Sequence, residues 1–261
     1  TPFYATPSHF FNNVVLSEAF DNLSKILHLQ DWYATLVMIF KAATGELMFQ
    51  QTARLFADMR NKIKSGQMEG MLETEIVADI SRTFWRTALL EFQARMNQRE
   101  QQLKSIFLSI PDTSKKMFKK ALSSDIQATT DKIKRCISNQ NVFASPQSRQ
   151  RLLDSSPARI NHLRIEFENK VKSMHRPSGD HADTIVLLKY LGTLKLHLEQ
   201  QKQLSIRLEK QVSRISAYTL LGFMFNNIYK SMFREEWWIK STAKEKSSDA
   251  DVDEATLHAT V

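Results

Sequence analysis

The sequence predicts an all-α protein, an elongated antiparallel helical bundle or coiled-coil-rich domain of about five helices. The chain has 261 residues, of which only six are glycine and six are proline. Glycine and proline are therefore rarer than in average proteins, which indicates few turns and long elements. Apolar residues recur at alternating spacings of three and four along most of the chain, as on one face of a helix. Runs rich in β-branched residues, which are typical of strands, are nearly absent.

The first half of the chain divides into an arm and three predicted helices. Pro2 and Pro7 indicate an extended arm over residues 1–13. Apolar spacing then predicts one long helix over residues 17–64, with a bend or break at Gly45 as an alternative. A second helix is expected over 69–110, with a water-facing polar stretch at 93–104, and Pro111 ends or kinks it. The third helix is expected over residues 112–137.

The second half begins with residues 138–156, which have no sustained period and are expected to be a linker within the helical domain. Ser156 and Pro157 then match an N-cap followed by proline at the first helical position. They predict a short helix that ends near Met174. The longest helix is expected over 180–240, a stretch without proline. Its predicted seam takes alternate steps of four and three: Leu187, Leu191, Leu194, Leu198, Gln201, Ser205, Leu208, Val212 and Ile215.

The domain expected from these elements covers residues 14–240. Residues 241–261 hold five acidic and two basic side chains and few large apolar ones. Such a composition cannot bury enough apolar surface to fold alone, so we expect a disordered acidic tail.

Composition narrows the function classes. The single cysteine, Cys136, excludes an intramolecular disulfide and any multi-cysteine metal site, which favours a reducing, cytoplasmic location. No signal peptide is visible in residues 1–10. Motifs for a nucleophile elbow, a phosphate-binding loop, a dinucleotide site or a zinc protease are absent. We therefore expect no catalytic residue, no cofactor and no metal.

A group of potential metal ligands has a simpler interpretation. His175, Asp180, His181 and Asp183 cluster at one break in the helical pattern. Asp180 and Asp183 are better explained as caps at the start of the next helix, where a negative charge is favourable. An enzyme whose catalytic groups come from distant positions, or a secreted effector-type protein, stays an alternative.

Basic residues are concentrated in the middle of the chain, and the net charge is +8. Such a face attracts anionic lipid or nucleic-acid phosphates, while an ordinary solvated helix face is the competing interpretation. Lysine outnumbers arginine here and no aromatic ladder suits base stacking, so nucleic acid is less favoured. The candidate anionic-surface residues are Lys115, Lys116, Lys119, Lys120, Lys132, Lys134 and Arg135.

The last predicted helix ends in an aromatic stretch at 218–238. It is too short and too polar to span a membrane. Two interpretations stay open: the thickest part of the bundle core, or an interfacial helix with aromatic rings at the headgroup level. The candidate interfacial aromatic residues are Phe225, Tyr229, Phe233, Trp237 and Trp238.

These observations favour a non-enzymatic helical scaffold or adaptor. It would bind protein partners through helical faces, and a cytoplasmic or peripheral-membrane location with anionic lipid as a further partner follows from the basic face. A homodimer is an alternative assembly. A nucleic-acid-binding helical protein is the alternative function that composition leaves open.

Overall fold

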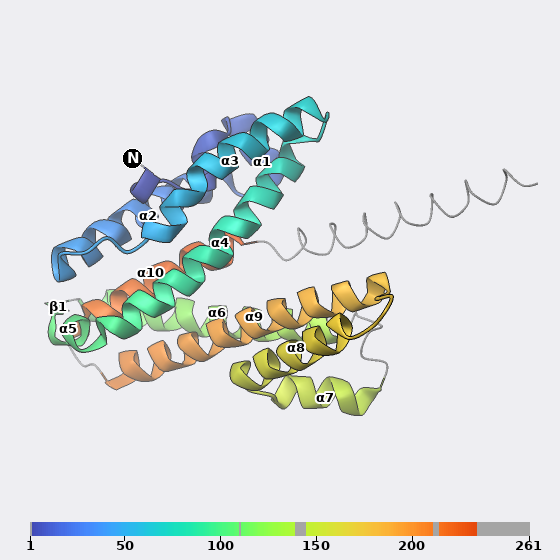
Figure 1. Ribbon diagram of the computed structural model, residues 1–261. Coiled ribbons are helices and arrows are strands. Elements are labelled where there is room, and N and C mark those ends of the chain that lie inside the picture. The colour runs from blue at the N-terminus through green and yellow to red at the C-terminus, as the bar shows by residue number, and fades with distance from the viewer. Residues whose placement is uncertain (1, 110, 139–144, 211–213, 234–261) are drawn as a thin grey trace, which may run out of the picture. The chain divides into compact units, whose positions relative to one another are not determined.

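The computed structural model describes residues 2–109, 111–138, 145–210 and 214–233 (Figure 1). Helices account for 84% of these residues, which confirms the all-α prediction. The chain forms two compact units. Within the described residues, the first consists of residues 2–109, 111–125, 201–210 and 214–233, and the second of residues 126–138 and 145–200. The tail expected over residues 241–261 lies outside the described residues. Two long helices, α6 (Asp112–Ser138) and α9 (Gly179–Lys210), contribute to both units.

The first unit contains most of the short elements. Within the described residues it comprises two 3₁₀ turns, the main helices, a pair of short strands and parts of α6 and α9. Its complete elements are η1 (Pro2–Tyr4), η2 (Pro7–Phe10), α1 (Asn13–Ala19), α2 (Leu23–Thr44), α3 (Gln50–Met68), α4 (Glu73–Gln98), α5 (Glu100–Ser105), β1 (Phe107–Ser109), β2 (Arg214–Ser216) and α10 (Ala217–Met232).

The N-terminal segment is not an extended arm. It forms η1 and η2, and Thr6, Pro7 and Ser8 are buried. The Ser8 hydroxyl accepts a hydrogen bond of 2.7 Å from the Gln30 side chain on α2. The prediction failed because the two prolines here begin tight turns that pack on the unit.

The single helix expected over 17–64 is three helices, and the reason lies in local capping. The Asn12 side chain accepts from the first N–H groups of α1, and the Asn22 side chain caps α2 by accepting from Lys25. Gly45 ends α2 with a φ of 79°, a left-handed conformation that glycine adopts without a Cβ clash. These signals override an apolar pattern that continues across the breaks.

The helix expected over 69–110 also divides. It consists of α4 and α5, and the chain then enters β1, which pairs antiparallel with β2. Leu108 lies opposite Ile215, and the Ala217 N–H donates to the Ile106 carbonyl at 2.9 Å. The stretch 93–104 does not simply face water, because Gln93, Met96 and Leu103 are buried.

The longest prediction, one helix over 180–240, is wrong. In the structure this stretch forms α9, then the short strand β2, and then α10. The Ser216 hydroxyl accepts from the Thr219 N–H and so starts a new helix. Leu208 and Ile215 are both buried but belong to different elements, Leu198 is partly exposed, and Val212 lies outside the described residues. The predicted count of five helices is therefore too low, since ten α-helices occur in the described part of the chain.

Aromatic side chains fill the core of the first unit. Phe92 on α4 and Phe225 on α10 stack with centroids 4.0 Å apart and rings 7° from parallel. Tyr33 on α2 stacks on Phe49 at 4.9 Å and meets Trp85 edge-on. The core thus joins α2, α4 and α10.

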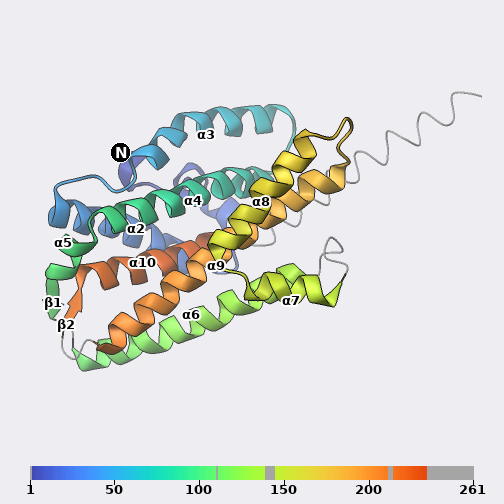
Figure 2. The same ribbon diagram turned by 60° about the horizontal axis from the view of Figure 1, so that its bottom comes forward.

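The second unit contains α7 (Pro146–Asp154), α8 (Pro157–Lys172), most of α9 and the end of α6 (Figure 2). The expected linker over 138–156 contains α7, which begins with Ser145 as its N-cap; residues 139–144 lie outside the described residues. Ser156 caps α8 as predicted. The buried ammonium of Lys195 on α9 donates to the Leu153 and Ser155 carbonyls at the end of α7.

Candidate functional site

Four of the predicted basic residues, Lys115, Lys116, Lys119 and Lys120, lie in the first turns of α6, and we call them the lysine face. Lys116 and Lys120 are exposed, whereas Lys115 and Lys119 are half-buried. Positions four apart stack on one side of a helix, so the two pairs cover one continuous arc.

The lysine face is electrostatically uncompensated. None of its four ammonium groups forms an ion pair or hydrogen bond with any residue that the structure describes. Some other cations of the first unit are neutralised: Lys62 pairs with Asp79, and Lys104 and Arg207 both pair with Glu100. The four charges of α6 are therefore available to an external anion.

An apolar side chain stands beside these charges. Met117 is 72% exposed, far above what a core residue shows. The adjoining side of α6 is anchored, because Leu122 is buried and Phe118 meets Phe223 of α10 edge-on at 4.5 Å. Lys115 and Lys119 border this anchored side and are half-buried, whereas Lys116, Lys120 and Met117 lie further round the helix and are exposed.

The remaining predicted basic residues belong to the second unit. Lys134 and Arg135 are exposed, and Lys132 is half-buried. They are separated from the lysine face by the point at which α6 passes from one unit to the other. The seven residues therefore do not form one site within a unit, although they share one helix.

The predicted interfacial aromatic residues lie in the core. Phe225, Tyr229 and Phe233 are at most 2% exposed. Their rings stack in series, with centroids 5.9 Å apart for the first pair and 5.1 Å for the second. Burial raises the pKa of the Tyr229 hydroxyl. An interfacial role for these three is thus corrected to a core role, while Trp237 and Trp238 lie outside the described residues.

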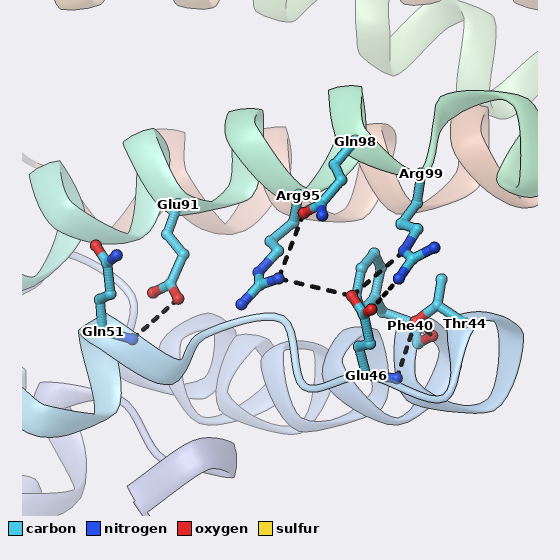
Figure 3. Close-up of polar contacts among 8 residues, drawn as sticks. All are labelled: Phe40, Thr44, Glu46, Gln51, Glu91, Arg95, Gln98 and Arg99. Atoms are coloured by element: carbon cyan, nitrogen blue, oxygen red, sulfur yellow. Dashed lines mark hydrogen bonds and ion pairs between the residues drawn. The ribbon is translucent and has the colours of Figure 1, made fainter.

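A row of charged side chains on α4 holds the connection between α2 and α3 (Figure 3). The guanidinium of Arg99 donates to both carboxylate oxygens of Glu46, and Arg95 lies 3.6 Å from the same carboxylate. The hydrogen bond from Arg99 is the main cause that lowers the pKa of Glu46. The Thr44 hydroxyl also accepts from the Glu46 N–H at 3.2 Å.

Glu91 lies one turn before Arg95 on α4 and caps the start of α3. Its carboxylate accepts from the Gln51 N–H, as Figure 3 shows, at 2.9 Å. It also accepts from the N–H and the hydroxyl of Thr52, each at 2.9 Å. The carboxylate thus satisfies free N–H groups at the start of α3, where Phe49 at the N-cap position has no side-chain acceptor. Sequence reasoning missed this row, because the partners lie about 40 to 53 residues apart.

The carboxylates in Figure 3 are occupied in holding helices together and offer no free general base. The Ser178 hydroxyl lies 2.6 Å from His181 Nδ1, a distance that suits a nucleophile and a base. However, Ser178 is exposed, His181 is half-buried, and the Ser178 N–H also donates to the ring, so this is a local turn at the start of α9. Among the described residues no group of three metal-ligating side chains converges.

One small cavity lies between α3 and α4. Its volume is about 120 Å³, and Gly66, Met71, Ile76 and Asp79 line part of it. Ligand pockets are typically several times larger. This cavity therefore gives no basis for a small-molecule site.

Within the described part of the chain, no helix combines the length and the apolar content needed to cross a bilayer. Comparisons with protein-family models, with curated proteins and with solved structures found no match. The candidate site with the clearest physical signature is therefore the lysine face with Met117.

Proposed function

We propose that this protein is a non-enzymatic helical scaffold that docks on an anionic membrane surface through the lysine face. The remaining helical surfaces would then be available to protein partners. The observation that carries the proposal is the set of four neighbouring lysines without a counter-charge among the described residues, next to the exposed Met117.

The energetics are sufficient for binding to an anionic lipid surface. A basic side chain near an anionic bilayer contributes about 1 kcal/mol, so four together give about 4 kcal/mol. The attraction is screened over roughly 8–10 Å at physiological salt and should weaken as salt is added. Nucleic acid carries a similar negative charge. However, the exposed Met117 beside the lysines cannot form the hydrogen bonds by which proteins recognise bases.

Flotation with vesicles that contain phosphatidylserine tests the proposal. The variant with Lys115, Lys116, Lys119 and Lys120 all changed to Glu should lose binding, while the wild-type protein floats at low salt and less at high salt. Its far-ultraviolet spectrum should stay helical, because Lys and Glu have similar helix propensity.

A matched control tests whether vesicle binding depends on the position of the four lysines or only on the net charge of the protein. Lys25, Arg54, Lys64 and Lys202 are exposed cations of the same unit without a described ion pair, and they are dispersed over three helices. Changing these four to Glu alters the net charge equally and should weaken flotation much less. Equal losses in both variants would mean that overall charge, and not the lysine face, governs binding.

A nucleic-acid shift assay on the same variants covers the alternative function. If the wild-type protein ignores anionic vesicles at low salt but retards nucleic acid, the membrane proposal is wrong. The protein would then be better described as a nucleic-acid-binding helical protein.

A further inference from the structure

The surface around the lysine face carries more exposed apolar area than electrostatic docking needs. Met117 projects from α6 at 72% exposure. Phe107 and Leu108 of β1 are 50% and 38% exposed. Large apolar side chains are usually buried, so three of them beside a cationic face indicate contact with something apolar as well as anionic.

The chain keeps these residues together. β1 ends at Ser109 and α6 begins at Asp112, so the link between them spans at most about 10 Å. Figures 1 and 2 both show β1 and the start of α6 at the same end of the first unit, beside α5. Met117 follows five residues into α6, about 7.5 Å along the helix axis.

The backbone of β1 sets how deeply this surface can enter a bilayer. The bond from Ala217 to Ile106 makes these two a hydrogen-bonded pair, and pairs alternate along an antiparallel ladder. Leu108 therefore directs its N–H and carbonyl toward β2, while those of Phe107 and Ser109 point outward. Unpaired backbone groups are costly in hydrocarbon but are hydrated among headgroups. The boundary between headgroups and acyl chains suits both these groups and the apolar side chains.

Successive side chains of a strand point to opposite faces, so Phe107 and Leu108 flank the outer edge of β1 on its two sides. We propose that this edge and Met117 form an apolar wedge that inserts at the boundary while the lysine face contacts lipid phosphates. The inference rests on the proposed membrane docking and adds its mode of binding. Charge complementarity selects the occupant: the four cations require an anion, and the apolar side chains require an apolar layer directly beneath it. An anionic bilayer supplies both within the depth of one side chain.

A fluorescent probe tests insertion directly. In a Cys136→Ala background, an environment-sensitive fluorophore is attached after Met117→Cys. The control carries the same fluorophore after Met68→Cys, because Met68 is 89% exposed in the same unit and Glu69 is its neighbour. On phosphatidylserine vesicles the probe at position 117 should shift its emission to the blue, and the probe at position 68 should not.

A second measurement removes the apolar side chains. Changing Phe107, Leu108 and Met117 to Ser should lower vesicle partitioning at least tenfold, since each side chain then loses apolar burial. The matched control changes Met68, Met71 and Leu72 to Ser, which are also exposed apolar residues of this unit. It should bind as the wild-type protein does, and helical spectra check that both variants fold.

The outcomes separate the two proposals. If the wild-type protein binds vesicles and the four-Glu variant does not, while the serine variant binds normally and the probe at position 117 stays in water, the wedge is refuted and electrostatic docking stands. If the wild-type protein does not bind at low salt, the docking proposal and the wedge both fall.

Discussion

Two helical glycines differ in what surrounds them. A Cβ on Gly222 of α10 would lie 2.7 Å and 2.9 Å from the two terminal carbons of Leu204 on α9. A Cβ on Gly192 would meet only Ile160, at an ordinary 3.7 Å. Gly222 thus allows α10 and α9 to approach closely, whereas Gly192 adds only flexibility to its helix.

The same substitution should therefore have opposite effects at the two positions. Gly192→Ala should stabilise by up to about 1 kcal/mol, the helix propensity difference. Gly222→Ala should destabilise by about 1–2 kcal/mol, because crowding of the buried Leu204 exceeds that gain. Urea unfolding of both variants measures the difference. A Gly222→Ala variant as stable as Gly192→Ala would show that Leu204 moves aside without cost.

The candidate site residues differ in how well the sequence alone predicted their surroundings. The lysines of α6 were recognisable from the sequence, because charge density is a local property. The surroundings of Phe225 and Tyr229 were not, because an aromatic stripe looks the same whether it meets a neighbouring helix or a membrane. Burial at 0% and 2% settles that they are core residues.

At the scale of elements, α3 depends on a cap supplied from another helix. Glu91 is only 6% exposed, and three donors at the start of α3 converge on its carboxylate. A charged acceptor forms stronger hydrogen bonds than a neutral one and also faces the positive end of the helix dipole.

Glu91→Gln should therefore destabilise the protein by about 1–3 kcal/mol in chemical unfolding. Glu209→Gln, at an exposed glutamate of α9 without a described partner, should change stability by less than about 0.5 kcal/mol. Adding Thr52→Val to Glu91→Gln should cost less than the sum of the two single changes, because both remove the same contact. Additive losses would argue against the cap.

The boundaries of elements were the weakest part of the sequence prediction. Apolar spacing continues across residues 20–22, 45–49 and 211–216, so periodicity alone joined segments that are separate helices. The chain is divided by Asn12 and Asn22, by Gly45 and by Ser216, whose caps are short-range signals. Where the same kind of signal was used, at Ser156 and Pro157, the helix start was confirmed.

At the scale of the whole molecule, titration should limit stability on both sides of neutral pH. Hydrogen bonds from Arg99 and Lys104 lower the pKa values of Glu46 and Glu100. A lowered folded-state pKa gives stability that is present above the unfolded value and lost as pH falls through the folded one. Burial raises the pKa values of Tyr33 and Tyr229, so their contribution is present below the unfolded value and lost as pH rises beyond it.

The melting temperature should accordingly decline in acid below the ordinary glutamate pKa of 4.5 and in alkali above the ordinary tyrosine pKa of 10.0. Arg99→Gln should bring the pKa of Glu46 back toward its ordinary value, which NMR titration of the carboxyl carbon can follow. It should also make the acid decline shallower. Arg54→Gln, at an exposed arginine without a described ion pair, is the control. An unchanged Glu46 titration in Arg99→Gln would contradict the assignment of its partner.

The sequence by itself determined the helical class, the basic stretch at the start of α6 and the absence of a recognisable catalytic motif. These follow from composition and from contacts within one or two turns. Only the tertiary structure decided which faces are buried, how α6 and α9 contribute to two units, and that Glu91, Arg95 and Arg99 hold the start of α3 and the connection before it. Those features depend on residues far apart in the chain, and apolar periodicity carries no information about which partner an element meets.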